Sequence, residues 1–240
     1  MIIDFHCHIG KDSDGGLLDI PSLKNSMDKW GIDKSVIFPF SGSHEEMVRS
    51  SLQILKESKK DNWIIPFLRI NPKDTNEEEL QELFDKGFKG LKLHPSGQKF
   101  EVDSEDFFWI YEICEKRKLP ILIHCAEAVD YAHPKRIINL ALKFPDLNII
   151  MAHFFGNDID LIKDAVKLPN LYTDTSIQAR TLRINQAFYE KGFERMIFAS
   201  DAPYDSQGVA LLKIRESNLK KKDEELILSG NAIKVLGLNN

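Results

Sequence analysis

Residues 2–8, with the sequence IIDFHCH, form a short apolar run that ends in two histidines. Residues two apart in a β-strand point to the same face and lie roughly 7 Å apart along the strand. His6 and His8 can therefore converge on one metal ion. Two histidines at this spacing also occur by chance, so the rest of the sequence has to show whether further ligands meet them.

Further apolar runs of this kind follow along the chain, and helical patterns fill the gaps between them. Near-continuous hydrophobicity is typical of parallel strands that are buried on both faces. The eight expected strands span residues 2–8, 34–40, 63–71, 88–95, 119–126, 148–155, 171–177 and 196–203. Strand and helix repeated in this way within 240 residues predict an α/β fold, a single (β/α)8 TIM barrel that forms one domain over residues 1–240.

A doubly wound open sheet is the alternative to a barrel. Such a sheet usually carries a glycine-rich phosphate loop after its first strand. The segment after the first strand here reads IGKDSDGG (residues 9–16) and lacks the G-x-G-x-x-G spacing. The sequence therefore favours the barrel and gives no sign of a nucleotide site.

Two local patterns predict where helices begin. Ser43 with Glu46, and Thr75 with Glu78, each match a capping box, in which the two side chains bond to each other's backbone N–H groups. Gly87 stands where the second of these helices is expected to end.

The composition excludes several classes of protein. With 42% hydrophobic residues, 29% charged residues and a net charge of −5, the chain is a soluble globular type without the basic surface that binds nucleic acid. No apolar run reaches the roughly 18 residues of a membrane span, and no signal peptide is expected. Cys7, Cys114 and Cys125 are too scattered for a disulfide framework and fit a reducing cytoplasm.

Side chains that can bind metal recur at the ends of the expected strands. In a barrel, chemistry is located at the carboxyl ends of the strands. The residues at these ends are His6 and His8 (first strand), Lys92 and His94 (fourth), His124 (fifth), His153 (sixth) and Asp201 (eighth). Imidazole and carboxylate ligands suit Zn²⁺, Mn²⁺ or Fe²⁺, and we expect Zn²⁺ first. Alternation along the strands turns Cys7 and Cys125 away from this site, towards the helices.

The whole pattern resembles the amidohydrolase superfamily, which has HxH on strand 1, histidines on strands 5 and 6, and aspartate on strand 8. The resemblance runs from DFHCH (residues 4–8) to SGNAIKVLGL (residues 229–238). The segments KGLKLHP (89–95), IMAHFFG (150–156) and ASDAPY (199–204) resemble the amidohydrolase-related branch of metal-dependent hydrolases and decarboxylases.

The resemblance implies that His6, His8, His124 and Asp201 bind one metal ion. Asp201 and His153 would be the catalytic residues. A divalent cation lowers the pKa of a bound water towards roughly 7, and Asp201 could take the proton of that water and pass it to a leaving group. His153 would hydrogen-bond the water or the substrate. The implied function is hydrolysis of an ester, lactone or amide bond in a small molecule.

Lys92 has three open roles. It could pair with a carboxylate, such as that of Asp4 on the face that carries His6. It could bind an anionic substrate. The third role is a carboxylated lysine that bridges two metal ions, in which case His153 would bind the second ion. We expect one ion, because binuclear relatives often carry an extra N-terminal sandwich domain.

The remaining polar candidates are weaker. Arg69 and Arg180 could each clamp a substrate carboxylate or form a structural salt bridge. His94 is expected to line the pocket, and His44, at a helix start, to be solvated. Asp174 and Ser176 are interpreted first as packing residues at a strand end. Two further candidates, Glu127 and His133, lie in the loop after the fifth strand.

Three alternatives to a hydrolase remain. The first is a non-oxidative decarboxylase that uses the same ligands. The second, a metal-dependent deoxyribonuclease, usually has Glu at the position of Lys92. The third is a metal-binding barrel without catalytic activity. The expected partner is a small molecule that carries a carboxylate. The sequence leaves open whether the protein forms a homo-oligomer.

Overall fold

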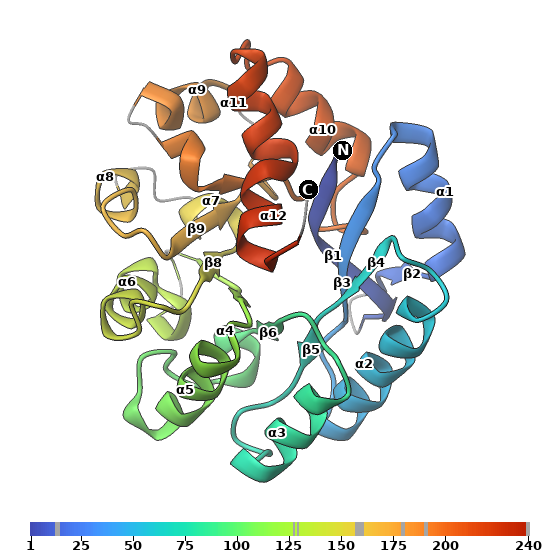
Figure 1. The fold of residues 1–240 in the computed structure, drawn as a ribbon, viewed down its shortest axis with the longest axis vertical. Helices are drawn as coiled ribbons and strands as arrows, with labels where there is room; N and C mark the ends of the chain where they lie inside the picture. Colours follow the sequence, from blue (N-terminus) through green and yellow to red (C-terminus); the bar gives the residue numbers. More distant parts are fainter. Residues whose placement is uncertain are drawn as a thin grey trace.

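Parallel strands close into a barrel, and helices surround it (Figure 1). The structure is a computed structural model, and it describes residues 1–12, 15–126, 128, 130–156, 161–178, 181–189 and 192–238. The strands are β1 (Ile3–Lys11), β2 (Leu17–Leu18), β3 (Lys34–Pro39), β4 (Ile64–Pro66), β5 (Leu68–Arg69), β6 (Leu91–Leu93), β7 (Ile121–Ile123), β8 (Ile149–Met151), β9 (Leu171–Asp174) and β10 (Met196–Ile197). The predicted (β/α)8 barrel is confirmed.

Hydrogen bonds between the first strand and the last close the barrel. Phe5 N donates to Phe198 O over 3.0 Å, and Asp201 N donates to His6 O over 2.9 Å. The third predicted strand, residues 63–71, consists of two short pieces, β4 and β5, on either side of Phe67. Pro66 has no N–H to donate, and hydrogen bonding resumes from Phe67 N to Ile37 O. β2 was not predicted and pairs antiparallel with the end of β1.

The helices follow the strands along the chain and surround the barrel on its outside. They are α1 (Ile20–Trp30), α2 (His44–Ser58), α3 (Glu77–Asp85), α4 (Pro95–Gln98), α5 (Phe108–Arg117), α6 (Pro134–Lys143), α8 (Ile162–Ala165), α9 (Thr181–Tyr189), α10 (Gln207–Arg215), α11 (Lys221–Glu225) and α12 (Asn231–Leu236), with a π-helical segment, Leu226–Gly230, between the last two. Among the described helices, none has both the length and the apolar character to cross a bilayer.

One of the two predicted capping boxes is confirmed. The Ser43 side chain accepts from Glu46 N, and the Glu46 carboxylate accepts from Ser43 N, so α2 begins there. The prediction for α3 is wrong by one residue, because Asn76 is the cap and its side chain accepts from Glu79 N over 3.0 Å. Asparagine caps a helix at least as well as threonine, so both residues fit the turn that precedes α3.

Two apolar layers hold the barrel. The inner layer fills the barrel below the strand ends and comprises Ile3, Phe5, Val36, Phe38, Ile65, Phe67, Leu122, Ile150, Ala152, Tyr172, Ile197 and Ala199, closed at the far end by Ala232 and Val235 of α12. In Figure 1, α12 crosses the end of the barrel. The outer layer lies between strands and helices, and it contains Cys7, Cys114 and Cys125, as the strand alternation predicted for Cys7. Cys125 was predicted to turn away from the site, but it also lines the cavity at the strand ends.

A β-bulge in β1 changes which side chains face the interior. The pairing of β1 with β3 shifts register between Asp4 and Cys7. Phe5 belongs to the inner layer, yet its neighbour His6 also points inside, into the cavity above that layer. Asp4 points outward, where its Oδ2 accepts from Ser200 Oγ over 2.6 Å. The suggested pair of Asp4 with Lys92 is therefore wrong.

Candidate metal centre

A cavity of about 380 Å³ lies at the carboxyl ends of the strands. Its lining includes eight of the residues that the sequence singled out, namely His6, His8, Arg69, Lys92, His94, His124, His153 and Asp201. Phe40, Ser41, Cys125, Ala126, Ile177 and Tyr204 complete its lining. Two other candidates, Arg180 and Glu127, lie outside the described residues.

Two histidines of β1 and one aspartate form a compact group of possible metal ligands. Asp201 Oδ1 lies 3.0 Å from His6 Nε2 and 3.1 Å from His8 Nε2. These ligand atoms all lie within 4.8 Å of one another, and all three side chains are buried. The β-bulge positions His6 and His8, and the backbone bond from Asp201 N to His6 O holds the two strand ends together.

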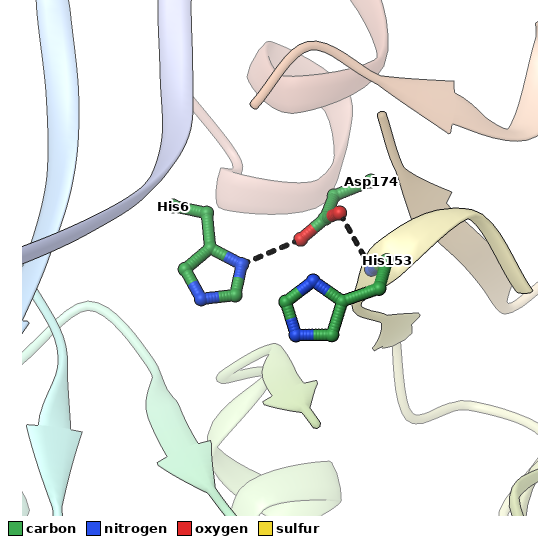
Figure 2. A group of neighbouring side chains, drawn as sticks. All are labelled: His6, His153 and Asp174. Carbon is green, nitrogen blue, oxygen red and sulfur yellow. Dashed lines mark hydrogen bonds and ion pairs between the residues drawn. The ribbon is translucent and has the colours of Figure 1, made fainter. Parts of the chain in front are cut away.

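Asp174, at the end of β9, orients His6. Figure 2 shows its carboxylate facing His6 with one oxygen and the backbone nitrogen of His153 with the other. The distances are 2.7 Å from Asp174 Oδ2 to His6 Nδ1 and 2.9 Å from Asp174 Oδ1 to His153 N. An ionised carboxylate only accepts, so His6 carries a proton on Nδ1, and Nε2 offers a lone pair whenever the ring is neutral.

This arrangement fits a divalent cation. When His6 is neutral, the lone pair of its Nε2 faces the carboxylate oxygen of Asp201 at 3.0 Å, and a cation between or beside these two acceptors would stabilise both. A metal-binding histidine usually donates its other ring N–H to a carboxylate, as His6 does to Asp174. Lys92 Nζ lies 3.2 Å from His6 Nε2 and supplies positive charge at the same place.

His124 lies in the cavity wall and its Nδ1 faces His153. His153 Nε2 is 3.0 Å from His124 Nδ1, and His153 Nδ1 is 2.9 Å from Ser176 Oγ. The His124 ring stacks on His94, with ring centroids 3.9 Å apart and an interplanar angle of 8°. His153 also forms a second candidate metal group with His6 and Asp174, so the two candidate groups share His6.

Burial sets the charges of these groups. It lowers the pKa of His8 to about 3 and that of His153 to about 4, so both imidazoles are neutral at pH 7. Burial alone would raise the pKa of Asp174, but the His6 imidazole holds it at about 2. The pKa of Asp201 also lies well below its usual range, since His6 and His8 outweigh burial. Neutral imidazoles beside ionised carboxylates are the forms that bind metal.

Two buried basic side chains, Arg69 and Lys92, make the cavity suitable for an anion. Burial, and next to it the charge of Arg69, lower the pKa of Lys92 to about 7. Arg69 donates from its two terminal nitrogens to Pro39 O at 2.9 Å and to Ser41 Oγ at 2.6 Å. These bonds hold the guanidinium at the cavity wall, where it can attract a carboxylate.

The weaker candidates fall into two groups. Asp174 and Ser176, interpreted first as packing residues, contact the histidines directly, and their place at a strand end next to the other polar ends was the signal for that role. His133 caps α6 by accepting from Lys135 N over 3.2 Å. The expectation that His44 is solvated is wrong, because it is buried with Nε2 3.0 Å from the Glu79 carboxylate.

We expect Asp174→Asn to weaken metal binding by about 10- to 100-fold, the range for outer partners of metal ligands. The amide that replaces Oδ2 would donate to His6 Nδ1, which moves the proton of His6 to Nε2 and removes the lone pair that faces Asp201. Competition with a chromogenic chelator measures the affinity. Asp223→Asn, a change at a buried aspartate of α11, is the matched control, and equal affinities in both variants would contradict the role of Asp174.

A parallel barrel with imidazole and carboxylate donors at the carboxyl ends of its strands defines the class of metal-dependent barrel enzymes. The chain belongs to the amidohydrolase family (Amidohydro_2), whose model matches residues 3–238. The resemblance drawn from the HxH motif and the strand-end histidines is thereby confirmed.

Several solved structures share the fold. A 5-carboxyvanillate decarboxylase from Novosphingobium aromaticivorans with bound manganese is 15% identical, with a TM-score of 0.83 over 99% of this chain and 97% of that one. A manganese-bound dihydroxybenzoic acid decarboxylase from Polaromonas is 18% identical, with a TM-score of 0.81 over 100% and 97%. A probable 2-pyrone-4,6-dicarboxylic acid hydrolase from Acinetobacter baumannii, with citric acid bound, is 15% identical, with a TM-score of 0.72 over 99% of both chains.

One curated protein matches a short segment only. The 2-isopropylmalate synthase of Clostridium acetobutylicum is 42% identical over 45 residues, which are 19% of this chain and 8% of that protein. This chain thus corresponds to a small part of that relative's length, and the match carries no argument about the barrel.

Proposed function

We propose that the protein is a metal-dependent hydrolase that cleaves an ester, lactone or amide bond in a small molecule bearing a carboxylate. The observation that carries this proposal is the position of Asp201, whose Oδ1 lies 3.0 Å and 3.1 Å from the Nε2 atoms of His6 and His8. One carboxylate beside two imidazole ligands can hold a cation and also accept a proton from a neighbouring water.

His6, His8, His124 and Asp201 would hold the ion, which would be Zn²⁺ or Mn²⁺ because this set of ligands suits both. Two proteins of similar fold hold manganese, which supports a divalent ion. When bound, such an ion lowers the pKa of a water towards roughly 7 and polarises a carbonyl group. Proton transfer and substrate binding are carried out by the protein's own side chains.

Three sets of side chains have roles in the proposed reaction. Asp201 takes a proton from the attacking water and returns it to the leaving oxygen or nitrogen. His153, in the cavity wall, hydrogen-bonds the reacting groups. Arg69 and Lys92 bind the carboxylate of the substrate and fix its orientation, which brings the scissile bond to Asp201.

Decarboxylation is the second candidate, and the paired cations Arg69 and Lys92 favour it. They could hold a carboxylate group next to the metal ligands. The carbon–carbon bond would break to release CO₂, and the electron pair left on carbon would take a proton that Asp201 had first accepted from a water in the cavity. Two proteins of similar fold are decarboxylases of aromatic acids, which supports the same candidate.

A product assay separates the two reactions. We expect metal-loaded protein to release acid, followed by pH-stat titration, from one or more members of a panel of carboxylate-bearing lactones, esters and amides. Hydroxybenzoates in the same panel report CO₂ release. EDTA-treated protein and Asp201→Asn are the controls. CO₂ release without acid release from the other substrates would replace the hydrolase by the decarboxylase.

A further inference from the structure

A continuous chain of hydrogen bonds joins Asp174 to His124. Ser176 Oγ lies 2.6 Å from Asp174 Oδ1 and 2.9 Å from His153 Nδ1. His153 Nε2 then lies 3.0 Å from His124 Nδ1. Asp174 and Ser176 are fully buried, so water does not compete for these bonds.

The donors in this chain follow from the chemistry of its members. A carboxylate has no hydrogen to give, so the single hydroxyl hydrogen of Ser176 goes to Asp174. Ser176 Oγ then accepts, and the hydrogen between it and His153 has to come from His153 Nδ1. A neutral imidazole carries one N–H, so His153 Nε2 holds a lone pair, and the hydrogen facing it belongs to His124 Nδ1.

The backbone of His153 is held by the same strand end. Residues 153–156, drawn as α7 (His153–Gly156) in Figure 1, form a left-handed turn, with φ of 63°, 53°, 57° and 63°. This conformation is costly for residues with a side chain, and neighbouring bonds have to stabilise it. His153 N donates to Asp174 Oδ1 over 2.9 Å, and Phe155 N donates to Thr173 Oγ1 over 2.8 Å. The end of β9 therefore fixes both the backbone and the ring of His153.

We propose that Asp174 and Ser176 lock His153 in the tautomer with its proton on Nδ1, so that His153 Nε2 acts as a hydrogen-bond acceptor and not as a donor. This inference rests on the proposed function, and it excludes one role for His153. In the described geometry the acceptor is filled by the hydrogen of His124 Nδ1, which holds the His124 ring in place. A donor would polarise the carbonyl oxygen of the substrate, and this tautomer has no hydrogen on Nε2 to give.

The same chain sets the proton of His124. Its Nδ1 carries the hydrogen that faces His153, so its Nε2 keeps the lone pair that a cation needs. Asp174 acts directly on His6 and, through Ser176 and His153, on His124. The buried carboxylate of Asp174 thus leaves Nε2 of two predicted ligands, His6 and His124, available for a cation. Ser176 is a positioning residue, because it connects Asp174 to His153 and through His153 to His124.

Histidine tautomers are read directly by two-dimensional ¹H–¹⁵N NMR of the full chain, because protonated and bare ring nitrogens resonate in separate ranges. Spectra are recorded at pH 7 on protein exchanged into Zn²⁺, which is diamagnetic, and on EDTA-treated protein. His153→Asn assigns the signals of His153 by their loss. We expect Nδ1–H and a bare Nε2 for His153 in the parent protein. A parent spectrum with the proton on His153 Nε2 overturns the proposal.

Ser176→Ala tests the chain itself. We expect it to move the proton of His153 wholly or partly to Nε2, and to lower kcat by about 10- to 100-fold, the range for outer partners of a metal site. Ser176→Thr keeps the hydroxyl and should restore the Nδ1–H form. Ser217→Ala removes another buried hydroxyl, one that bonds Lys213 O, and should change neither readout.

Failure of this proposal differs from failure of the proposed function. An unchanged His153 tautomer in folded Ser176→Ala overturns the role of Ser176 even when the protein is an active hydrolase. If Ser176→Ala does not fold, the parent spectrum and Ser176→Thr still decide the tautomer. A protein that binds no metal yet shows His153 Nδ1–H in the EDTA-treated sample would contradict the proposed function and leave the tautomer assignment standing.

Discussion

Replacing His6 or Asp201 by alanine is expected to strip the protein of its divalent metal and to lower turnover by roughly a thousandfold or more. The two residues supply possible metal-ligand atoms 3.0 Å apart at the centre of the candidate site, so the loss of either leaves the ligand set incomplete. A metal ion contributes several kcal/mol to transition-state stabilisation, and each 1.36 kcal/mol corresponds to a factor of about ten in rate. Elemental analysis of purified proteins gives the metal content.

The control for this experiment is His133→Ala. His133 is also a histidine of a strand-to-helix loop, but its Nδ1 caps α6 by accepting from Lys135 N. The variant should keep the metal and the activity of the parent. Equal metal content in His6→Ala, Asp201→Ala and the parent protein would refute the site, whatever the activities.

His153→Asn should leave the metal in place and lower kcat by about 100- to 1000-fold, with a much smaller change in KM. Asparagine keeps a polar side chain at the cavity wall but lacks the two ring nitrogens, which bond Ser176 and His124. A group that acts mainly in the transition state affects kcat more than KM, and removing one such group costs this order of rate.

Metal stoichiometry gives the second readout for His153→Asn. With one ion held by His6, His8, His124 and Asp201, the variant keeps a full complement. If two ions were bound and bridged by a carboxylated Lys92, His153 would be a ligand, and the variant would lose about one ion per chain. Full metal content with unchanged turnover would show that His153 only packs in the wall.

The barrel and its polar rim, the ring of polar residues at the carboxyl ends of the strands, could be predicted because they depend on local sequence pattern. Each expected strand is a short apolar run, and parallel strands bring their carboxyl ends together wherever the intervening helices lie. His6, His124 and Asp201 are distant in sequence but share that rim, so their residue types were enough to predict a common site.

The parts that were missed depend on contacts between distant segments. Strand alternation fails between Phe5 and His6, since the bulge that turns both inward is set by pairing with β3. The role of Asp174 follows from its approach to His6, 168 positions away along the chain. His44 is buried because Glu79 of α3 comes within 3.0 Å of it, which no local pattern signals.

The apolar filling of the barrel limits how molecules reach the imidazoles. Phe5 and Phe67 meet edge to face below them, with centroids 5.6 Å apart, and Ala232 and Val235 of α12 close the opposite end. A through-channel along the barrel axis is therefore ruled out by this filling. In the part of the chain that the structure describes, the exposed large hydrophobic side chains of the cavity lining are Ile177 and Tyr204, which mark its opening. In the proposed reaction, substrate and product would pass through this opening, so we expect a product that leaves slowly to compete with the next substrate.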